Sequence, residues 1–389
     1  MTVRWLLVPL LVGACTHSEP FTNDVVLPGP RTSGANVQLT YNVDQDYWPI
    51  WTADGSAILY AFVDPDVPKH RCIGLLPPTG GTRIWQMCHN DATYDDSISS
   101  FTAYALAADG RLLYVEAVTP TVPGIPVGSQ AAPFETTLWL ADTAAPFRRT
   151  ALLSLPANVN GSAVSWLGDL AWTGPNTFVA LGQYYAIALH CFGVCIPPVP
   201  GGSLYDTVWS TGTIATASGI VVRGTIANGQ ATLTAVARTA GATGYSLAES
   251  GTSIVFTLRD DNRLYQVPAS GGAVVTVGQA TSPALPGNQL FGVSCLGTTC
   301  VVATDSATLT RLEPSHLFPM LNGGLRELRS ISLVTGSSST LASYQSVISA
   351  PQLSPRGDLV LQVGGLWGHL ETYEGSEQSD LYLLIGVVH

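Results

Sequence analysis

Charge is what this sequence has least of. Asp, Glu, Lys and Arg make up 11% of its 389 residues, whereas soluble domains average roughly 25%. Lysine occurs once, at Lys69, and acidic residues outnumber basic ones to give a formal net charge of −11. No basic run is present. The composition therefore argues against nucleic-acid binding, which needs clustered Lys and Arg to neutralise phosphates, and against electrostatic attachment to a membrane.

The familiar sequence motifs of enzymes are missing as well. There is no Gly-x-Ser-x-Gly elbow, no His-Glu-x-x-His helix, no phosphate-binding loop and no dinucleotide fingerprint. The seven histidines are scattered, and their spacing assembles no Ser–His–Asp trio. The sequence therefore identifies no reaction, and what it does indicate is architecture, compartment and covalent links.

Long apolar runs are restricted to the N-terminus. Arg4 precedes the apolar residues 5–12, which are too few to span a bilayer and are typical of an export signal. They lead into Val12-Gly13-Ala14-Cys15, which resembles a bacterial lipobox. The resemblance implies that residues 1–14 are a lipoprotein signal peptide and that Cys15 carries the lipid. An ordinary signal peptide is the alternative.

The next segment is polar and rich in proline and glycine, so we expect residues 15–36 to be a flexible tether and residues 37–389 to be the folded domain. Two or more acyl chains on Cys15 would anchor the protein stably. We therefore expect a location in the bacterial cell envelope, at the outer membrane, in the periplasm or on the extracellular face, with the lipid as the only membrane contact.

What the chain has in abundance is hydrophobic residues, at 46%, and one stretch, residues 47–62, shows how they are organised. Asp54-Gly55 is a hairpin dipeptide, because Gly accepts a positive φ and Asp can accept a hydrogen bond from the backbone two residues on. Trp51 precedes this turn, and Ile58 and Tyr60 follow it on an alternating apolar run. This Trp-x-x-Asp-Gly-x-x-Ile-x-Tyr pattern resembles the repeat of TolB-like and WD-repeat-like β-propellers.

Weaker copies of the stretch recur along the chain at intervals of roughly 30 to 65 residues, and repeats of about 40–50 residues with four strands each are typical of propellers. The resemblance implies an all-β propeller with seven four-stranded blades, six or eight remaining open. A β-sandwich or a two-domain β protein is the alternative. The seven candidate copies begin at Trp51, Leu106, Trp172, Thr216, Leu247, Ser294 and Leu353.

The two ends of the domain are predicted to meet. After the strand that contains Leu381 and Tyr382, too few residues remain for a fourth strand in the last repeat. Residues 37–41 form a strand-like segment with no partner before the first repeat. We therefore expect 37–41 to join the last blade and close the ring, which would remove open sheet edges.

Six cysteines remain besides Cys15, an even number in an exported chain. Fifteen pairings are possible, and the local ones fit the expected hairpins best, because the partners flank short turns. A zinc site at Cys191 and Cys195, beside His190, is the competing interpretation. The expected local pairs are Cys72 with Cys88, Cys191 with Cys195 and Cys295 with Cys300.

The densest polar clusters follow the first repeat and could bind Ca²⁺, another divalent ion or a polar ligand. A solvated acidic connection between blades is the plainer explanation. We otherwise expect no cofactor and no defined metal site. The candidate binding residues are Asp64, Asp66, His70, Arg71, His89, Asp91, Asp95 and Asp96.

The tryptophans could suggest a sugar-binding platform, but in a propeller such residues more often fill the space between blades. We therefore expect a monomeric binding or scaffold module of the cell envelope whose partner is an envelope protein or a polymeric ligand. The alternative is a propeller enzyme, a hydrolase or lyase acting on a glycan or peptide at the central channel. Fold alone does not decide between these functions.

Overall fold

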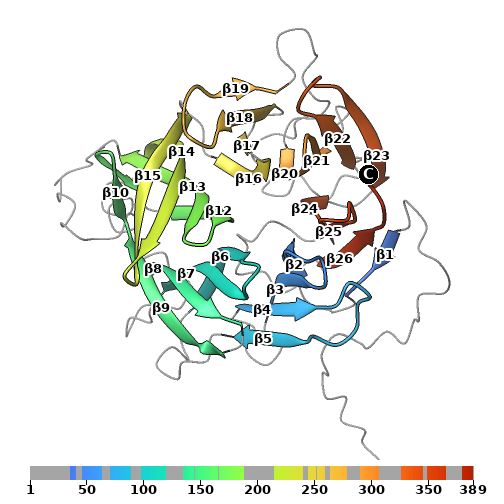
Figure 1. The fold of residues 1–389 in the computed structure, drawn as a ribbon, viewed down its shortest axis with the longest axis horizontal. Coiled ribbons are helices and arrows are strands. Elements are labelled where there is room, and N and C mark those ends of the chain that lie inside the picture. Colours follow the sequence, from blue (N-terminus) through green and yellow to red (C-terminus); the bar gives the residue numbers. More distant parts are fainter. Residues whose placement is uncertain are drawn as a thin grey trace, which may run out of the picture.

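The computed structural model describes residues 36–40, 46–63, 71–88, 98–119, 135–143, 145–164, 166–187, 214–239, 244–250, 252–258, 263–277, 290–305, 326–344, 348–364 and 379–388. Every regular element within these ranges is a β-strand. Six four-stranded antiparallel sheets stand around a common centre as the blades of a propeller (Figure 1). The predicted all-β propeller is therefore confirmed.

The first three blades follow one another in the chain, and in each the first strand is innermost. Blade 1 contains β2 (Asp46–Trp51), β3 (Ile58–Val63), β4 (Arg71–Leu76) and β5 (Trp85–Cys88). Blade 2 contains β6 (Ile98–Leu106), β7 (Arg111–Thr119), β8 (Glu135–Asp142) and β9 (Ala145–Leu155). Blade 3 contains β12 (Trp166–Gly174), β13 (Thr177–Ile187), β14 (Ile214–Ala227) and β15 (Gln230–Thr239).

The other three blades repeat this plan, and a small hairpin separates blades 2 and 3. The hairpin consists of β10 (Ala157–Val159) and β11 (Ser162–Val164). Blade 4 contains β16 (Gly244–Ser250), β17 (Ser253–Leu258), β18 (Leu264–Pro268) and β19 (Val275–Thr276). Blade 5 contains β20 (Leu290–Leu296), β21 (Thr299–Asp305), β22 (Arg326–Ser332) and β23 (Ser338–Tyr344). Blade 6 contains β24 (Ile348–Leu353), β25 (Leu359–Gly364), β26 (Ser379–Leu384) and β1 (Asn36–Gln38).

The expected seventh blade is absent from these sheets, because the copy beginning at Thr216 is not a repeat. Gly219 lies inside the uninterrupted strand β14, where it pairs with Gln183 on one side and Thr239 on the other. The candidate therefore contains no turn and belongs to the third strand of blade 3. The other six copies coincide with the first hairpins of the six blades.

The N-terminal strand joins the last blade. Asn36 pairs with Leu384 and Gln38 with Tyr382, and the Leu39 amide donates to the Leu381 carbonyl over 2.7 Å. The predicted strand thus forms, but at 36–38 rather than 37–41. The described residues do not show a ring that is closed throughout. The expectation of a closed ring of seven blades is therefore corrected to six sheets, the last of which combines β1 from the N-terminal part of the chain with β24, β25 and β26.

The hydrophobic core lies between neighbouring blades. Tyr47 and Leu59 of blade 1 pack with Leu112 and Tyr114 of blade 2, and the second strands are buried on both faces. Fully burying one such side chain contributes about 1.5–3 kcal/mol. The apolar run around Tyr60 is therefore explained by a strand that is sandwiched between two blades.

The innermost strands share a feature that the repeat pattern did not reveal. Each of β2, β6, β12, β16, β20 and β24 contains a register shift against its second strand. Trp48 and Ala350 have positive φ at these bulges, and each precedes a proline, Pro49 or Pro351, that drops out of the pairing. A proline inside a strand-like run indicates a bulge or edge, so this signal was present in the sequence.

The antiparallel order gives the propeller two unlike faces. On the face that we call the turn face, the first and second strands of each blade are joined by residues 52–57, 107–110, 175–176, 251–252, 297–298 and 354–358. On the opposite, loop face, the second and third strands are joined by residues 64–70, 120–134, 188–213, 259–263, 306–325 and 365–378. The turn face is mostly described, whereas the loop-face connections lie almost wholly outside the described residues.

Candidate functional site: the axial cavity and the turn face

The binding residues predicted from sequence fall in and beside two connections of the chain. Asp64, Asp66 and His70 fall in the connection from β3 to β4, and His89, Asp91, Asp95 and Asp96 fall between blades 1 and 2. All of these lie outside the described residues. Arg71 begins β4 and pairs with Val63 through its backbone. The structure therefore does not test whether these side chains come together.

The first turn of blade 1 is held by its own polar side chains. The Asp54 carboxylate accepts hydrogen bonds from Thr52 Oγ1 at 2.7 Å, the Ser56 amide at 3.0 Å and Ser56 Oγ at 2.8 Å. The bond from Thr52, followed by those from Ser56, lowers the pKa of Asp54 to about 2. Gly55 supplies the positive φ. The predicted bond from Asp54 to the backbone two residues on is confirmed, and this carboxylate serves the turn.

Blade 2 repeats the arrangement and adds a cation. The Asp109 carboxylate accepts from the Arg111 amide at 3.2 Å and forms an ion pair with Arg111 Nε at 2.8 Å. The Arg111 guanidinium also donates to the Pro175 carbonyl and lies 5.1 Å from the centre of the Trp172 ring. Desolvation raises the pKa of Asp109, but the hydrogen bonds and the positive charge of Arg111 together outweigh it, so that the net shift of this pKa is downward. The pair thus links the first turns of blades 2 and 3.

Blade 6 holds the same turn with a serine. Ser354 Oγ accepts from the amides of Arg356 at 3.1 Å and Asp358 at 3.0 Å. The amide of Gly386 in the C-terminal tail donates to Asp358 Oδ1, and the Val387 amide donates to the Gly357 carbonyl. The described C-terminal residues are therefore fastened to the turn face of the last blade.

Two tryptophans fasten neighbouring blades at the same level. Trp51 Nε1 of blade 1 donates to the Gln352 carbonyl of blade 6 at 3.0 Å, and Trp172 Nε1 of blade 3 donates to the Ala105 carbonyl of blade 2 at 3.1 Å. These hydrogen bonds fix the two tryptophan rings. They also satisfy backbone carbonyls of β24 and β6, the first strands of the neighbouring blades. The prediction that these aromatics pack between blades is confirmed for Trp51 and Trp172.

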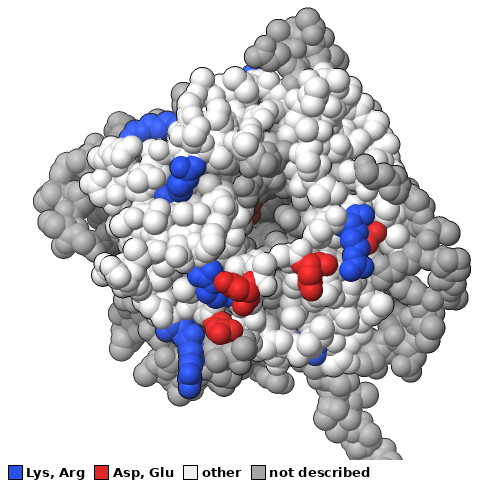
Figure 2. Space-filling model, in the orientation of Figure 1, with Lys and Arg blue, Asp and Glu red and all other residues white. Residues whose placement is uncertain are grey.

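A cavity of about 670 Å³ opens among these turns. The molecule is visibly hollowed at its centre (Figure 2). The lining of this cavity is dominated by alanine, leucine, proline and the two tryptophans. The charged residues among the lining residues are Asp109 and Arg111, which bind each other. Its lining residues are Ile50, Trp51, Thr52, Ala53, Ala105, Leu106, Ala107, Ala108, Asp109, Arg111, Leu170, Ala171, Trp172, Gly174, Pro175, Cys295, Leu296, Gln352, Leu353, Ser354 and Pro355.

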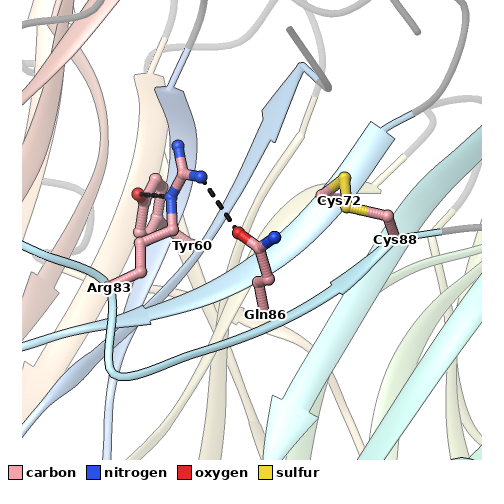
Figure 3. The surroundings of a disulfide bond; sticks show 5 residues. All are labelled: Tyr60, Cys72, Arg83, Gln86 and Cys88. Carbon is pink, nitrogen blue, oxygen red and sulfur yellow. Dashed lines mark hydrogen bonds between the residues drawn. A yellow bond between two sulfur atoms is a disulfide. The ribbon is translucent and has the colours of Figure 1, made fainter. Parts of the chain in front are cut away.

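Two of the three expected disulfides are confirmed. Cys72 and Cys88 face each other across β4 and β5, and Cys295 and Cys300 close the first hairpin of blade 5. Cys15, Cys191 and Cys195 lie outside the described residues. Beside the first disulfide, Arg83 Nε donates to Tyr60 Oη at 2.6 Å and Arg83 Nη1 donates to Gln86 Oε1 at 3.2 Å (Figure 3). The Arg83 guanidinium also covers the Phe62 ring. The disulfide therefore holds the end of β5 against β4, and Arg83 holds the turn before β5 against β3.

Sequence reasoning missed an ion pair buried in blade 2. Glu116 is 2% exposed and pairs with Arg149 Nη1 at 2.9 Å, while Arg149 also stacks on Trp139. Burial raises the pKa of Tyr114 to about 12, although the nearby Arg149 opposes this shift. Arg149 reaches the second-strand tyrosine from the outer strand, as Arg83 reaches Tyr60 in blade 1. In the sequence, the signal for this contact is an arginine that follows the third strand in both blades, Arg83 in blade 1 and Arg149 in blade 2.

Neither a metal centre nor a membrane span emerges from the ranges given above. Within them, no three His, Cys, Asp or Glu side chains are grouped to hold a metal ion. Likewise, the described part of the chain contains no helix with the length and hydropathy needed to cross a bilayer.

Comparison with known proteins supports the fold. No family model matches the sequence, and no curated protein matches it. Trypanosoma rangeli sialidase has a TM-score of 0.54 at 10% identity, over 90% of this chain and 56% of the sialidase chain. The fold is that of a β-propeller. Regucalcin from Agrobacterium tumefaciens, described as calcium-binding, has a TM-score of 0.48 at 15% identity, over 92% of this chain and 95% of its own.

The WD40 repeats of RRP9 are similar over 91% of this chain and all of theirs, with a TM-score of 0.45 and 13% identity. These propellers include both enzymes and binding proteins, and this chain spans little more than half of the sialidase chain. At identities of 10–15% the likeness establishes the fold alone, and the resemblance to TolB-like proteins is supported only as far as the propeller.

Proposed function

We propose that this chain is a TolB-like lipoprotein of the bacterial cell envelope that binds an envelope protein or polymeric ligand without transforming it. The observation that carries the proposal is the chemistry of the axial cavity. Its walls are mainly small and apolar side chains, and its two charged groups, Asp109 and Arg111, are engaged with each other. Such a hollow suits an inserted apolar side chain of a partner better than proton transfer, which needs a titratable group within reach of the substrate.

The position of the tether indicates where that partner lies. β1 runs antiparallel to β26, and Asn36 is opposite Leu384 at the turn-face end of blade 6. A tether formed by residues 15–36, with lipid on Cys15 and residues 1–14 removed, therefore meets the domain on the side where the cavity opens. This geometry favours a partner close to the same membrane.

The pairing of β1 with β26 also supports a closed ring. Leu39 packs with Leu381 and Leu383 between blades 6 and 1, and Gln38 and Thr40 contact Asp380. In our proposal this three-residue strand holds the first and last blades together. Deleting residues 36–40 should therefore lower stability without unfolding the other sheets, as measured by hydrogen exchange; unchanged protection in blade 6 would contradict it.

The alternative is a propeller enzyme, a hydrolase or lyase that acts on a glycan or peptide at the central channel. The sequence feature in its favour is the concentration of acidic and histidine residues in the connections from β3 to β4 and from β5 to β6, among them Asp64, Asp66 and His70. A Ca²⁺ site formed by these residues belongs to this alternative, and the leading proposal includes no cofactor.

The decisive experiment is affinity capture from bacterial membranes with the full chain, after mass spectrometry has established the acyl group on Cys15. We expect a specific protein or polymer to be captured and Ala53→Arg, which fills the cavity mouth, to abolish capture. Thr232→Arg, an equally exposed change on β15, is the matched control. Capture unaffected by Ala53→Arg, or turnover of a glycan or peptide panel, would overturn the proposal.

A further inference from the structure

Within the part of the chain that the structure describes, each blade ends in an outer strand that pairs with a neighbour on one side. An unpaired strand edge presents backbone N–H and C=O groups to any extended chain, and proteins usually block it with charge, proline, shortness or a covering segment. The six outer strands are β5, β9, β15, β19, β23 and β1. The six outer strands differ in length, in charge and in the segments that contact them, and these differences determine which edge can accept another strand.

Three outer strands are too short to accept a partner strand readily. β1 has three residues and β19 has two. β5 has four and is joined to β4 by the Cys72–Cys88 disulfide. A typical strand has about five or six residues, so these edges offer fewer backbone groups than a stable pairing needs.

Two of the long outer strands are protected by charge and by contacts. β9 contains Pro146 and carries the exposed Arg148. β15 carries Arg238, whose guanidinium donates to the Asn160 carbonyl at the tip of the β10–β11 hairpin over 3.2 Å. β15 also contacts both β9 and β10. A second strand arriving at either edge meets arginine or an existing neighbour.

Among the described residues, the outer strand of blade 5 has none of these protections. β23 has seven residues, Ser338 to Tyr344, with no charged residue and no proline. A register shift interrupts its pairing with β22, but β9 and β15 have such shifts too, so this feature does not distinguish β23. Its exposed residues are Ser338, Ser339, Thr340 and Ser343.

The hydroxyl groups of β23 are already arranged for contact across strands. Ser339 Oγ lies 2.7 Å from Ser330 Oγ of β22, and Arg329 donates to both Ser338 Oγ and Thr340 Oγ1 at 3.1 Å. Arg329 is in turn neutralised by Glu327 at 2.7 Å. The blade edge is therefore locally neutral although the whole chain carries a net charge of −11.

We propose that β23 pairs with β23 of a second copy of this chain, antiparallel across a twofold axis, so that two blade-5 sheets become one continuous sheet. Self-pairing places two copies of the same segment side by side, so that any charge on the edge is doubled in the interface; this favours an uncharged edge over one that carries arginine. Ser and Thr pairs across antiparallel strands also stabilise such contacts. This inference revises the expected monomer and is independent of the lipid anchor and of the axial cavity.

The proposed dimer is weak, because one seven-residue strand from each copy makes an interface at the small end of the known range. We expect a dissociation constant on the order of 10 µM, a value in the range of weak, transient interfaces. The test is sedimentation velocity of the full chain from 1 to 100 µM, with hydrogen–deuterium exchange at both extremes.

We expect a dimer fraction that rises with concentration, and slower exchange of the β23 amides at 100 µM. Ser343→Lys, which places one positive charge on the paired edge of each copy, should raise the dissociation constant at least tenfold. The matched control Thr232→Lys on the exposed face of β15 should leave it unchanged, and circular dichroism verifies that both variants fold. A monomer at 100 µM, dimerisation insensitive to Ser343→Lys, or β23 amides protected equally at both concentrations would overturn the inference.

Discussion

The polar residues of the turn face bind one another, whereas the binding residues predicted from the sequence fall in other connections of the chain. On the turn face, the side-chain oxygens of Asp54, Asp109 and Ser354 accept hydrogen bonds within their own turns. Arg111 forms an ion pair with Asp109 and donates a hydrogen bond to the Pro175 carbonyl. The acidic and histidine residues that the sequence offers as ligands fall in the connections from β3 to β4 and from β5 to β6, outside the described residues. The comparison teaches that the conspicuous Asp-Gly motifs stabilise the fold, and that a binding function on the turn face depends on the cavity between the turns.

The strongest test of this comparison removes the tryptophan that fastens blade 1 to blade 6. Trp51→Ala should lower the free energy of unfolding by about 3–5 kcal/mol, because a large side chain that is 9% exposed is lost. Urea denaturation measures the change. Trp51→Phe retains most of the packing and loses the hydrogen bond to the Gln352 carbonyl. Apart from the effect of its smaller buried area, it should lower the free energy of unfolding by only about 1 kcal/mol, the contribution of one hydrogen bond. Equal losses in both variants would contradict a role for the ring in packing.

The next effect concerns the two confirmed disulfides. Replacing Cys72 and Cys88 with alanine should destabilise the protein by about 3 kcal/mol, because a loop with a sequence separation of 16 is released. The Cys295–Cys300 loop has a separation of 5, so its double alanine variant should lose about 2 kcal/mol. Thermal denaturation under oxidising conditions compares them, with the reduced wild type as control. A larger loss at Cys295–Cys300 would reverse the expected order.

A smaller effect is expected from the exposed carboxylate of the first turn. The folded pKa of Asp54 is depressed to about 2 from 3.8, so its ionised form stabilises the folded state above pH 4 and this contribution is lost as pH falls toward 2. The melting temperature of Asp54→Asn should therefore lie below that of the wild type at pH 6, and the gap should narrow between pH 4 and pH 2. A gap independent of pH in this range would mean that ionisation of Asp54 does not matter.

The smallest effect on stability is expected on the loop face. Combining Asp64→Asn, Asp66→Asn and His70→Ala should change the free energy of unfolding by no more than about 0.5 kcal/mol, as is usual for surface changes. The same variant should retain partner capture if the axial cavity is the binding site. Loss of capture with unchanged stability would move the site to the loop face and favour the alternative that includes a Ca²⁺ or substrate site there.

Several features of the fold could be predicted because they depend on neighbours in the sequence. The Asp54-Gly55 turn, the alternating run through Tyr60 and the pairing of Cys72 with Cys88 across one hairpin all depend on local geometry. The number of blades could not be predicted in this way. Thr216–Gly219 resembles a turn between apolar segments, but its pairing with β13 and β15 on both sides keeps β14 continuous.

The sequence by itself therefore determined the repeating hairpins, the all-β class and the two short disulfide links, because each arises within a few tens of residues. Only the tertiary structure decided that there are six blades, that β1 pairs with β26 and that Trp51 bonds across to blade 6. It also placed a mainly apolar cavity at the axis and left β23 as an uncharged edge. These features depend on which blades become neighbours, and residues hundreds of positions apart specify that only when the whole chain has folded.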